Sequence, residues 1–439
     1  MSAEAPAPHA QQPGLQGKTY LRLVAFGALI GIPAAFLAAA FLAFVHEAEH
    51  WLWTDLPDAL GTSSPGWYLV IGLPVIGAVV VWLARRFLPG DGGHSPLLGF
   101  SGGPTRLIAG PGVVVAAVGT LSFGAVLGPE APLIALGSVV GLLITNFAKL
   151  EEKQRNVVAT AGSFAAISAL FGGPIVGGVL MLEAGVGLGA AVIPALIPGF
   201  VAAAVGYVIF IGLGTWGGLH EQAISVPGLP AYTGTNVPDL FLGIGVGIAA
   251  ALVLLAVRRI GTHVGERERS FGMAKLLLAG GLAVGALAEL ADLLGANSQD
   301  VLFSGQSAIP DLLAQNSTKI VLILIVAKGI AYAISLGCGF RGGPVFPAIF
   351  LGVGLATLTV LWFNASPTLA LAVGSAAGVA AMTRLLLSSI VFSALLVGTH
   401  GVDATPAAVL AATAAWITIS ALDRPARQPA AAPETAASS

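Results

Sequence analysis

The chain has 439 residues, of which 56% are hydrophobic and 9% are charged, and its mean hydropathy is +0.91. Because soluble domains carry roughly 25% charged residues, this composition predicts a multi-pass membrane protein surrounded by the lipid bilayer. The formal net charge of -2 argues against nucleic acid as a partner, since no basic surface can neutralise phosphates. The single cysteine, Cys338, excludes an intrachain disulfide and argues against a thiolate metal cluster.

The predicted organisation is one membrane domain between two tails. Residues 1–19 and 422–439 are rich in Ala and Pro, which is typical of disordered segments. Between them we expect a membrane domain over residues 20–421, with a first half over 20–215 and a second half over 238–421.

The apolar segments predict an all-α, polytopic fold with tilted and broken helices. Several of them are shorter than the ~20 residues that a membrane-crossing helix needs. Non-helical backbone is tolerated at membrane depth only where it lines a cavity or is covered by protein, so broken helices in corresponding positions of two halves indicate a binding site near the membrane centre. The segments lie near residues 21–45, 67–88, 107–126, 131–147, 156–170, 174–188, 190–213, 238–260, 272–294, 318–336, 346–363, 368–382, 386–398 and 404–421.

Positive charges predict the orientation of the chain in the cell membrane. Lys18 and Arg22 precede the first span, Arg85 and Arg86 follow the second, and a group of arginines follows the segment at 238–260. Cytoplasmic loops are enriched in Lys and Arg. We therefore expect these loops, the N-terminus and the C-terminus on the cytoplasmic side.

The end of the first span carries a motif with a different functional meaning. The segment HEAEH at 46–50 matches H-E-x-x-H, in which two histidines one turn apart bind zinc and the glutamate activates water. An intramembrane zinc metalloprotease is therefore a remote alternative. A third ligand would have to come from Asp292, Asp300 or Asp403, none of which lies in a matching motif, so we expect no metal site.

Two segments 215 positions apart show that the chain contains an internal repeat. GPEAPLIALG at 128–137 and GPVFPAIFLG at 343–352 share six positions, and Leu121 and Gly124 recur at the same offset as Leu336 and Gly339. Gly162 and Ser163 recur at 374–375, at an offset of 212. The pattern predicts two related halves, and the family resemblance described below implies that their topology is inverted.

Glu130 is the position at which the two copies differ most in charge, since Val345 takes its place in the second copy. An ionisable residue inside the membrane is costly, by roughly 2.5–3.5 kcal/mol on insertion scales, and usually faces a pathway. Pro129 favours a helix start here, and a helix start attracts anions. Glu130 therefore either caps its helix or gates an anion site, where the ionised carboxylate and a halide ion compete.

Four segments together resemble the CLC family of chloride channels and proton-coupled chloride antiporters. GPEAP at 128–132 is similar to the family's GxEGP element, and GGPVFPAIFLG at 342–352 resembles its GGxFxP element. GDGGHSP at 90–96 resembles GSGIP, and FGGPIVGGVLMLE at 171–183 resembles the segment after the first-half core helices. The similarity extends from about residue 20 to residue 421.

This resemblance implies a homodimer that is not an enzyme, has no cofactor and carries one anion pathway in each subunit. Chloride or another small anion would lie between the starts of broken helices, with Glu130 as the gate. By this resemblance, the anion-binding backbone comes from three helix starts: Gly128, Pro129 and Ala131; Val345 and Phe346; and Gly93, His94 and Ser95.

The chain also departs from the family pattern. Gly93 stands where the family has a serine, Val345 where it has a phenylalanine, and Ala184 where its antiporters have a proton-relaying glutamate. Glu183, next to Ala184, is either a proton path or a structural hydrogen-bond acceptor, and no tyrosine follows Tyr332. We therefore expect chloride permeation of the voltage-gated channel type, passive or weakly linked to protons. The alternative is a proton-coupled chloride or fluoride antiporter.

Overall fold

The computed structural model describes residues 17–99, 104–148, 150–185, 192–217, 226 and 228–423. These residues form an α-helical fold, whose one β-type feature is a single bridge between Gly128 and Gly343. The all-α fold is therefore confirmed. The predicted tails lie mostly outside the described residues, but the first helix already begins at Lys18 and Leu422 still belongs to the last one.

The first half consists of helices of very different length. Its elements are α1 Lys18–His50, the π-helical turn η1 Trp51–Asp55, α2 Leu56–Ala59, α3 Trp67–Phe87, the 3-10 turns η2 Pro96–Leu98 and η3 Leu107–Ala109, α4 Gly110–Leu121, α5 Glu130–Ala148, α6 Glu152–Leu170, α7 Pro174–Ala184 and α8 Val192–Gly217.

The second half repeats this order with additional short helices at one connection. Its elements are α9 Val237–Glu266, α10 Glu268–Phe271, α11 Met273–Leu293, α12 Ser298–Val301, α13 Ile309–Leu313, α14 Thr318–Gly337, α15 Val345–Phe363, α16 Pro367–Thr383, α17 Leu386–Val397, the 3-10 segment η5 Gly398–Ala404 and α18 Thr405–Leu422. The short helices α12 and α13 were not predicted, because they are too short to give an apolar period.

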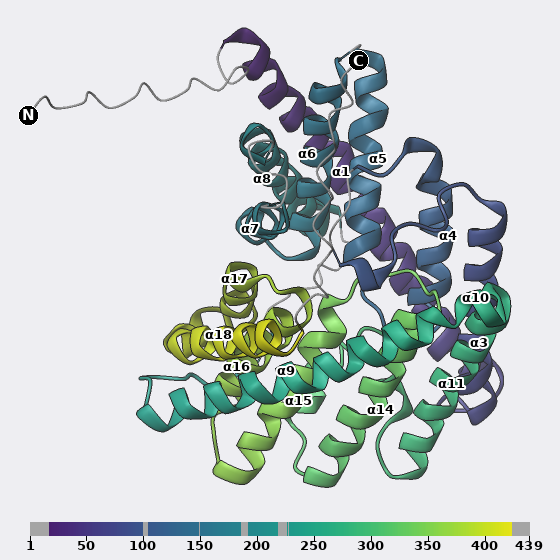
Figure 1. Cartoon of the computed structure of the whole chain (residues 1–439), viewed down its shortest axis with the longest axis vertical. Coiled ribbons are helices and arrows are strands. Elements are labelled where there is room, and N and C mark those ends of the chain that lie inside the picture. Colours follow the sequence, from purple (N-terminus) through teal and green to yellow (C-terminus); the bar gives the residue numbers. More distant parts are fainter. Residues whose placement is uncertain are drawn as a thin grey trace, which may run out of the picture.

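Equivalent helices of the two halves make equivalent contacts. In the first half α5 packs on α6, α6 on α8, and α1 on α8; in the second half α15 packs on α16, α16 on α18, and α9 on α18. Figure 1 shows α5–α8 in the upper part of the molecule and α9 with α14–α18 in the lower part. Helices α3 and α11, at the right of the same view, pack directly against each other and join the halves.

Paired glycines account for the close approach of the core helices. A Cβ atom on Gly137 in α5 would collide with the carbonyl oxygen of Gly162 in α6, and a Cβ on Gly352 in α15 would collide with that of Gly374 in α16. These are equivalent positions of the repeat. Small residues drive helix association in lipid because they allow backbones to touch, so the recurrence of Gly162 and Gly374 reflects the same helix crossing in both halves.

Helix lengths agree with a membrane protein built from full and partial spans. Seven helical stretches among the described residues are long and apolar enough to cross a membrane, and shorter apolar helices include Pro174–Ala184 and Pro367–Thr383. Helices α4 and α14 both end in the interior, and Gly124 and Gly339 beyond them have φ values of 88° and 98°. These equivalent glycines turn the chain toward the starts of α5 and α15.

We expect Gly352→Ala to destabilise the protein by about 1–3 kcal/mol, the range for overpacked cores, because its Cβ has no room against α16. Gly245→Ala in α9 is the matched control, since nothing lies within 4 Å of the added Cβ and alanine favours a helix. Thermal unfolding of both variants in detergent measures the difference. Equal melting temperatures for the two variants would contradict this packing.

Candidate anion site at two helix starts

The two copies of the repeated segment meet in the interior and run in opposite directions. Gly128 N–H donates to the Gly343 carbonyl over 2.7 Å, and Gly343 N–H donates to the Gly128 carbonyl over 2.5 Å. A Cβ on either glycine would collide with the carboxylate of Glu130. While the Glu130 side chain stays in this position, neither glycine of the bridge has room for a larger residue, which is a physical reason for this pair in the repeat.

The bridge places two helix starts side by side. Helix α5 begins at Glu130 and α15 begins at Val345, directly after the paired segments. Pro129 is partly buried and its carbonyl accepts the Leu133 N–H in the first turn of α5, and Ala131 is also partly buried. The first N–H groups of a helix have no partner within the helix, and they carry its positive dipole end. Two such ends facing one point favour an anion there.

The side chain of Glu130 occupies this point. It is fully buried, and its Oε1 accepts a hydrogen bond of 2.9 Å from the backbone N–H of Phe346 in the other half. Among the residues that the structure describes, its Oε2 has no hydrogen-bond partner. The carboxylate thus caps the start of α15 rather than only its own helix, and one oxygen remains unsatisfied.

Two polar side chains of α14 hold the segments on either side of the site. The Tyr332 hydroxyl donates to the Pro344 carbonyl over 2.6 Å, and the Ser335 hydroxyl accepts from the Val126 N–H at 3.0 Å. Both residues are fully buried and lie one turn apart. Nothing in the sequence singles them out, although a tyrosine and a serine at i and i+3 in an apolar helix are a weak signal for a shared polar contact.

Phenylalanine rings surround the start of α15. The ring of Phe346 lies 5.9 Å from that of Phe171 and 6.2 Å from that of Phe392, and these last two rings lie 4.8 Å apart. Phe171 ends α6 and Phe392 belongs to α17. The three buried rings exclude water from one side of the site, which strengthens the electrostatic interactions inside it.

The residues expected to supply a third helix start lie at the beginning of a 3-10 turn. Gly93 and His94 belong to a turn before η2, which is a single 3-10 turn with Ser95 as its N-terminal cap residue. His94 is exposed, and Gly93 packs on Val113 of α4. Among the described residues, these three make no direct hydrogen bond to residues 128–131 or to residues 345–346, so their part in the anion site stays a prediction.

Glu183 joins α7 to α17. Its carboxylate accepts hydrogen bonds from the backbone N–H of Leu387 at 3.0 Å, the backbone N–H of Ser388 at 2.8 Å and the Ser388 hydroxyl at 2.7 Å. Helix α17 begins at Leu386, so Glu183 caps a helix from another part of the chain. This arrangement corresponds to the structural acceptor among the two predicted roles.

The HEAEH segment has a simple environment in the structure. His46 and His50 are exposed at the end of α1, and Nδ1 of His50 lies 3.4 Å from a carboxylate oxygen of Asp55. Within the described ranges, no group of three or more His, Cys, Asp or Glu side chains gathers around a common point. Nothing in its geometry therefore supports the metalloprotease alternative.

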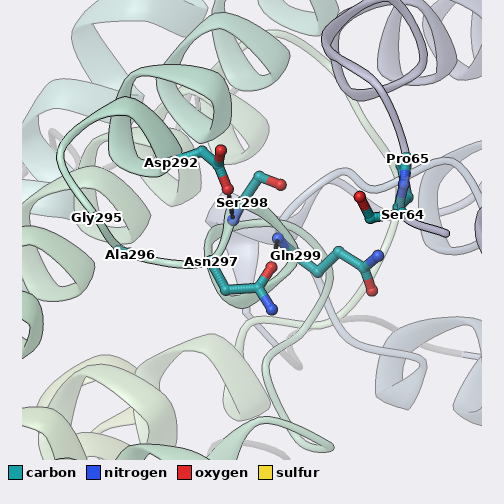
Figure 2. Close-up of a pocket in the computed structure, with 8 residues that line it drawn as sticks. All are labelled: Ser64, Pro65, Asp292, Gly295, Ala296, Asn297, Ser298 and Gln299. Carbon is teal, nitrogen blue, oxygen red and sulfur yellow. Dashed lines mark hydrogen bonds between the residues drawn. The ribbon is translucent and has the colours of Figure 1, made fainter. Parts of the chain in front are cut away.

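A surface cavity of about 450 Å³ lies at a different place from the Glu130 site. Figure 2 shows the residues around it: Ser64 and Pro65 on one side, and Asp292 with the segment Gly295–Gln299 on the other. The Asp292 carboxylate accepts from the Ser298 N–H at 3.4 Å, and the Asn297 side chain accepts from the Gln299 N–H at 2.9 Å. These contacts stabilise the turn into α12, and none involves the two helix starts.

Comparison with known proteins assigns a family to this architecture. The family model described as voltage gated chloride channel matches residues 76–419, which include both helix starts. Relatives named "Putative ion-transport protein YfeO" from Escherichia coli O7:K1 and from Escherichia fergusonii are each 27% identical over 354 residues. These matches cover 78% of this chain and 80% of each relative.

Solved structures share the fold at low sequence identity. A slow cyanobacterial Cl⁻/H⁺ antiporter superposes with a TM-score of 0.76 at 18% identity, covering 91% of this chain and 95% of its own. A CLC-type fluoride/proton antiporter gives a TM-score of 0.66 at 21% identity, with 91% and 96% covered. The family match and the repeated broken-helix fold agree: this chain belongs to the voltage-gated chloride channel (CLC) family.

Proposed function

We propose that this protein conducts chloride or another small anion between the starts of α5 and α15, with Glu130 as the gate. The observation that carries the proposal is the hydrogen bond from the Phe346 N–H to the Glu130 carboxylate, 2.9 Å long and fully buried. A carboxylate held by a helix-start N–H supports the proposal, because a free anion would use the same kind of donor. A permeating anion would need the same donors, together with the backbone at Gly128–Ala131 and Val345.

The gate follows from competition for these donors. While Glu130 is ionised and in place, its negative charge repels an approaching anion and its Oε1 occupies the Phe346 N–H. Protonation removes the charge and weakens the hydrogen bond, because charge-assisted hydrogen bonds are roughly twice as strong as neutral ones. The side chain can then leave, and the anion takes its place. The unsatisfied Oε2 lowers the cost of that departure.

We expect anion efflux from liposomes to increase several-fold for the wild type between about pH 7.5 and about pH 4.5, a range that reaches the usual pKa of a glutamic acid. Glu130→Gln should give efflux that no longer depends on pH, because its side chain carries no charge at any pH. Fluorescent or electrode detection of chloride measures both.

Glu152→Gln is the matched control for this experiment. Glu152 also lies in the first turn of a helix, α6, but it is exposed. Its variant should behave like the wild type. Unchanged efflux and unchanged pH dependence in Glu130→Gln would remove Glu130 from the role of gate.

We propose further that the conduction is passive or only weakly linked to protons. Two of the solved structures with this fold are described as Cl⁻/H⁺ and fluoride/proton antiporters, so proton-coupled exchange of chloride or fluoride is the second candidate. Against it, Ala184 has no titratable group, and all of the Glu183 hydrogen bonds serve the start of α17. A glutamate committed to three donors is poorly placed to exchange protons.

A chloride gradient should therefore drive little or no proton movement in wild-type proteoliposomes, as measured with an internal pH-sensitive dye. Glu183→Gln and Ser388→Ala should both lower thermal stability, by about 0.5–2 kcal/mol as for other lost helix caps, and both should retain anion efflux. Proton movement that is strong in the wild type and in Ser388→Ala but absent in Glu183→Gln would instead establish an antiporter with Glu183 on its proton path. Repeating the proton-movement assay with a fluoride gradient in place of the chloride gradient tests whether fluoride is the coupled ion.

We also propose a homodimer in the cell membrane with both chain ends in the cytoplasm. The expected cytoplasmic side carries Arg85 and Arg86 in the last turn of α3 and Arg267 and Arg269 around α10, in agreement with the positive-inside rule.

A further inference from the structure

A second carboxylate lies between cations at the turn that precedes η2. The Asp91 carboxylate accepts from Nε of Arg85 at 2.8 Å and from Nη2 of Arg85 at 3.2 Å, and it also accepts from Nη2 of Arg341. Nε of Arg341 donates to the Asp91 carbonyl over 2.9 Å. Arg85 ends α3 and Arg341 lies between α14 and α15, so residues from both halves converge on one carboxylate.

The two arginines belong to the fixed framework of the protein. Only 6% of each of their side chains is exposed. Nη1 of Arg85 donates to the Gly339 carbonyl at 3.2 Å, and the backbone N–H of Arg341 donates to the Thr120 hydroxyl at 3.1 Å. Glu268 reaches only Arg85, at 3.2 Å. Two buried guanidinium groups held in this way form a fixed pair of anion donors.

Asp91 is the exposed member of this cluster. Its side chain is 55% exposed, and the four residues Gly90, Asp91, Gly92 and Gly93 all have positive φ values, from 51° to 100°. Positive φ is uncommon outside glycine, although aspartate tolerates it better than most residues, and the backbone of the turn packs on η3 and α4 through Gly90 and Gly92. The anion is therefore the exposed partner on a glycine-rich turn, and the cations are the buried partners.

The cluster is continuous with the site at Glu130. Arg341 is followed by Gly342 and Gly343, and Gly343 forms the bridge that places α5 beside α15. The Thr120 hydroxyl that accepts from Arg341 belongs to α4, whose chain leads through residues 122–127 to the same bridge. The arginine pair thus lies at the far end of the short segments that form the helix starts.

We propose that Arg85 and Arg341 form a second binding site for the permeating small anion, which the Asp91 carboxylate occupies in this structure and an incoming anion displaces. The proposal rests on the proposed function, because the same anion would pass Glu130. The chemistry is the same at both places: a tethered carboxylate holds donors that suit a free anion. Here the donors are guanidinium groups, which bind anions through charge-assisted hydrogen bonds. The exposed Asp91 side chain would rotate toward solvent as the anion arrives.

Bromide binding to the purified full-length protein tests this proposal. Titration calorimetry of Asp91→Asn should show bromide binding with a half-saturating concentration about tenfold below that of the wild type, which corresponds to about 1.4 kcal/mol for removing the competing charge. Anomalous diffraction should place bromide beside Nη2 of Arg341 in this variant, and the peak should disappear in Asp91→Asn combined with Arg341→Gln.

Glu266→Gln is the matched control, because the exposed Glu266 carboxylate lies 3.7 Å from His263 and forms no ion pair with either arginine in the part of the chain that the structure describes; it should bind bromide like the wild type. If Asp91→Asn does not fold, wild-type crystals at saturating bromide serve instead, and they should show bromide between the arginines with the Asp91 side chain displaced. If no protein tested shows bromide at the arginine pair, Arg85, Asp91 and Arg341 form only an ion-pair network that stabilises the turn. That result would overturn the proposal.

The two proposals fail in different ways. If Glu130→Gln leaves efflux and its pH dependence unchanged while bromide binds between Arg85 and Arg341, Glu130 is not the gate, but the second anion site is supported. If Glu130→Gln removes the pH dependence of efflux while no bromide binds at the arginines, the gate stands and the second site is wrong.

Discussion

The backbone pairing of Gly128 with Gly343 is the interaction on which the other features of this molecule depend. Inside a membrane every backbone N–H and C=O must find a partner in the protein, and two helices that break in the interior would each leave such groups exposed. The antiparallel bridge satisfies both breaks at once. It also fixes the starts of α5 and α15 next to each other, so that a structural requirement of the bilayer creates an electropositive point between them.

Two glutamates in this chain cap the starts of helices to which they do not belong, and they differ in how many hydrogen bonds their carboxylates accept. Glu183 receives three hydrogen bonds from the start of α17, and both of its oxygens are used. Glu130 receives a hydrogen bond from Phe346 on one oxygen, and the other has no partner among the described residues. A fully bonded carboxylate is expensive to remove. A partly bonded one at a point that suits anions can be exchanged for another anion.

Much of the fold and part of the site could be predicted from the sequence, because the internal repeat gives each half a reference. The equivalence of Gly162 with Gly374 predicts a shared feature, and the structure shows the same helix contact in both halves. The cluster of Arg85, Asp91 and Arg341 could not be predicted. Asp91 and Arg341 lie 250 positions apart, the three residues share no recognisable motif, and only the folded chain brings them into contact. The same holds for Tyr332, whose partner is a backbone carbonyl that the sequence does not reveal.

The central claim is that an anion can take the place of the Glu130 carboxylate at the start of α15. The most direct measurement is anomalous diffraction from crystals of Glu130→Gln grown with bromide. The predicted result is a bromide ion within hydrogen-bonding distance of the Phe346 N–H, with the glutamine side chain moved away. A structure in which the glutamine carboxamide keeps the hydrogen bond to Phe346 and no bromide lies between α5 and α15 would contradict the claim.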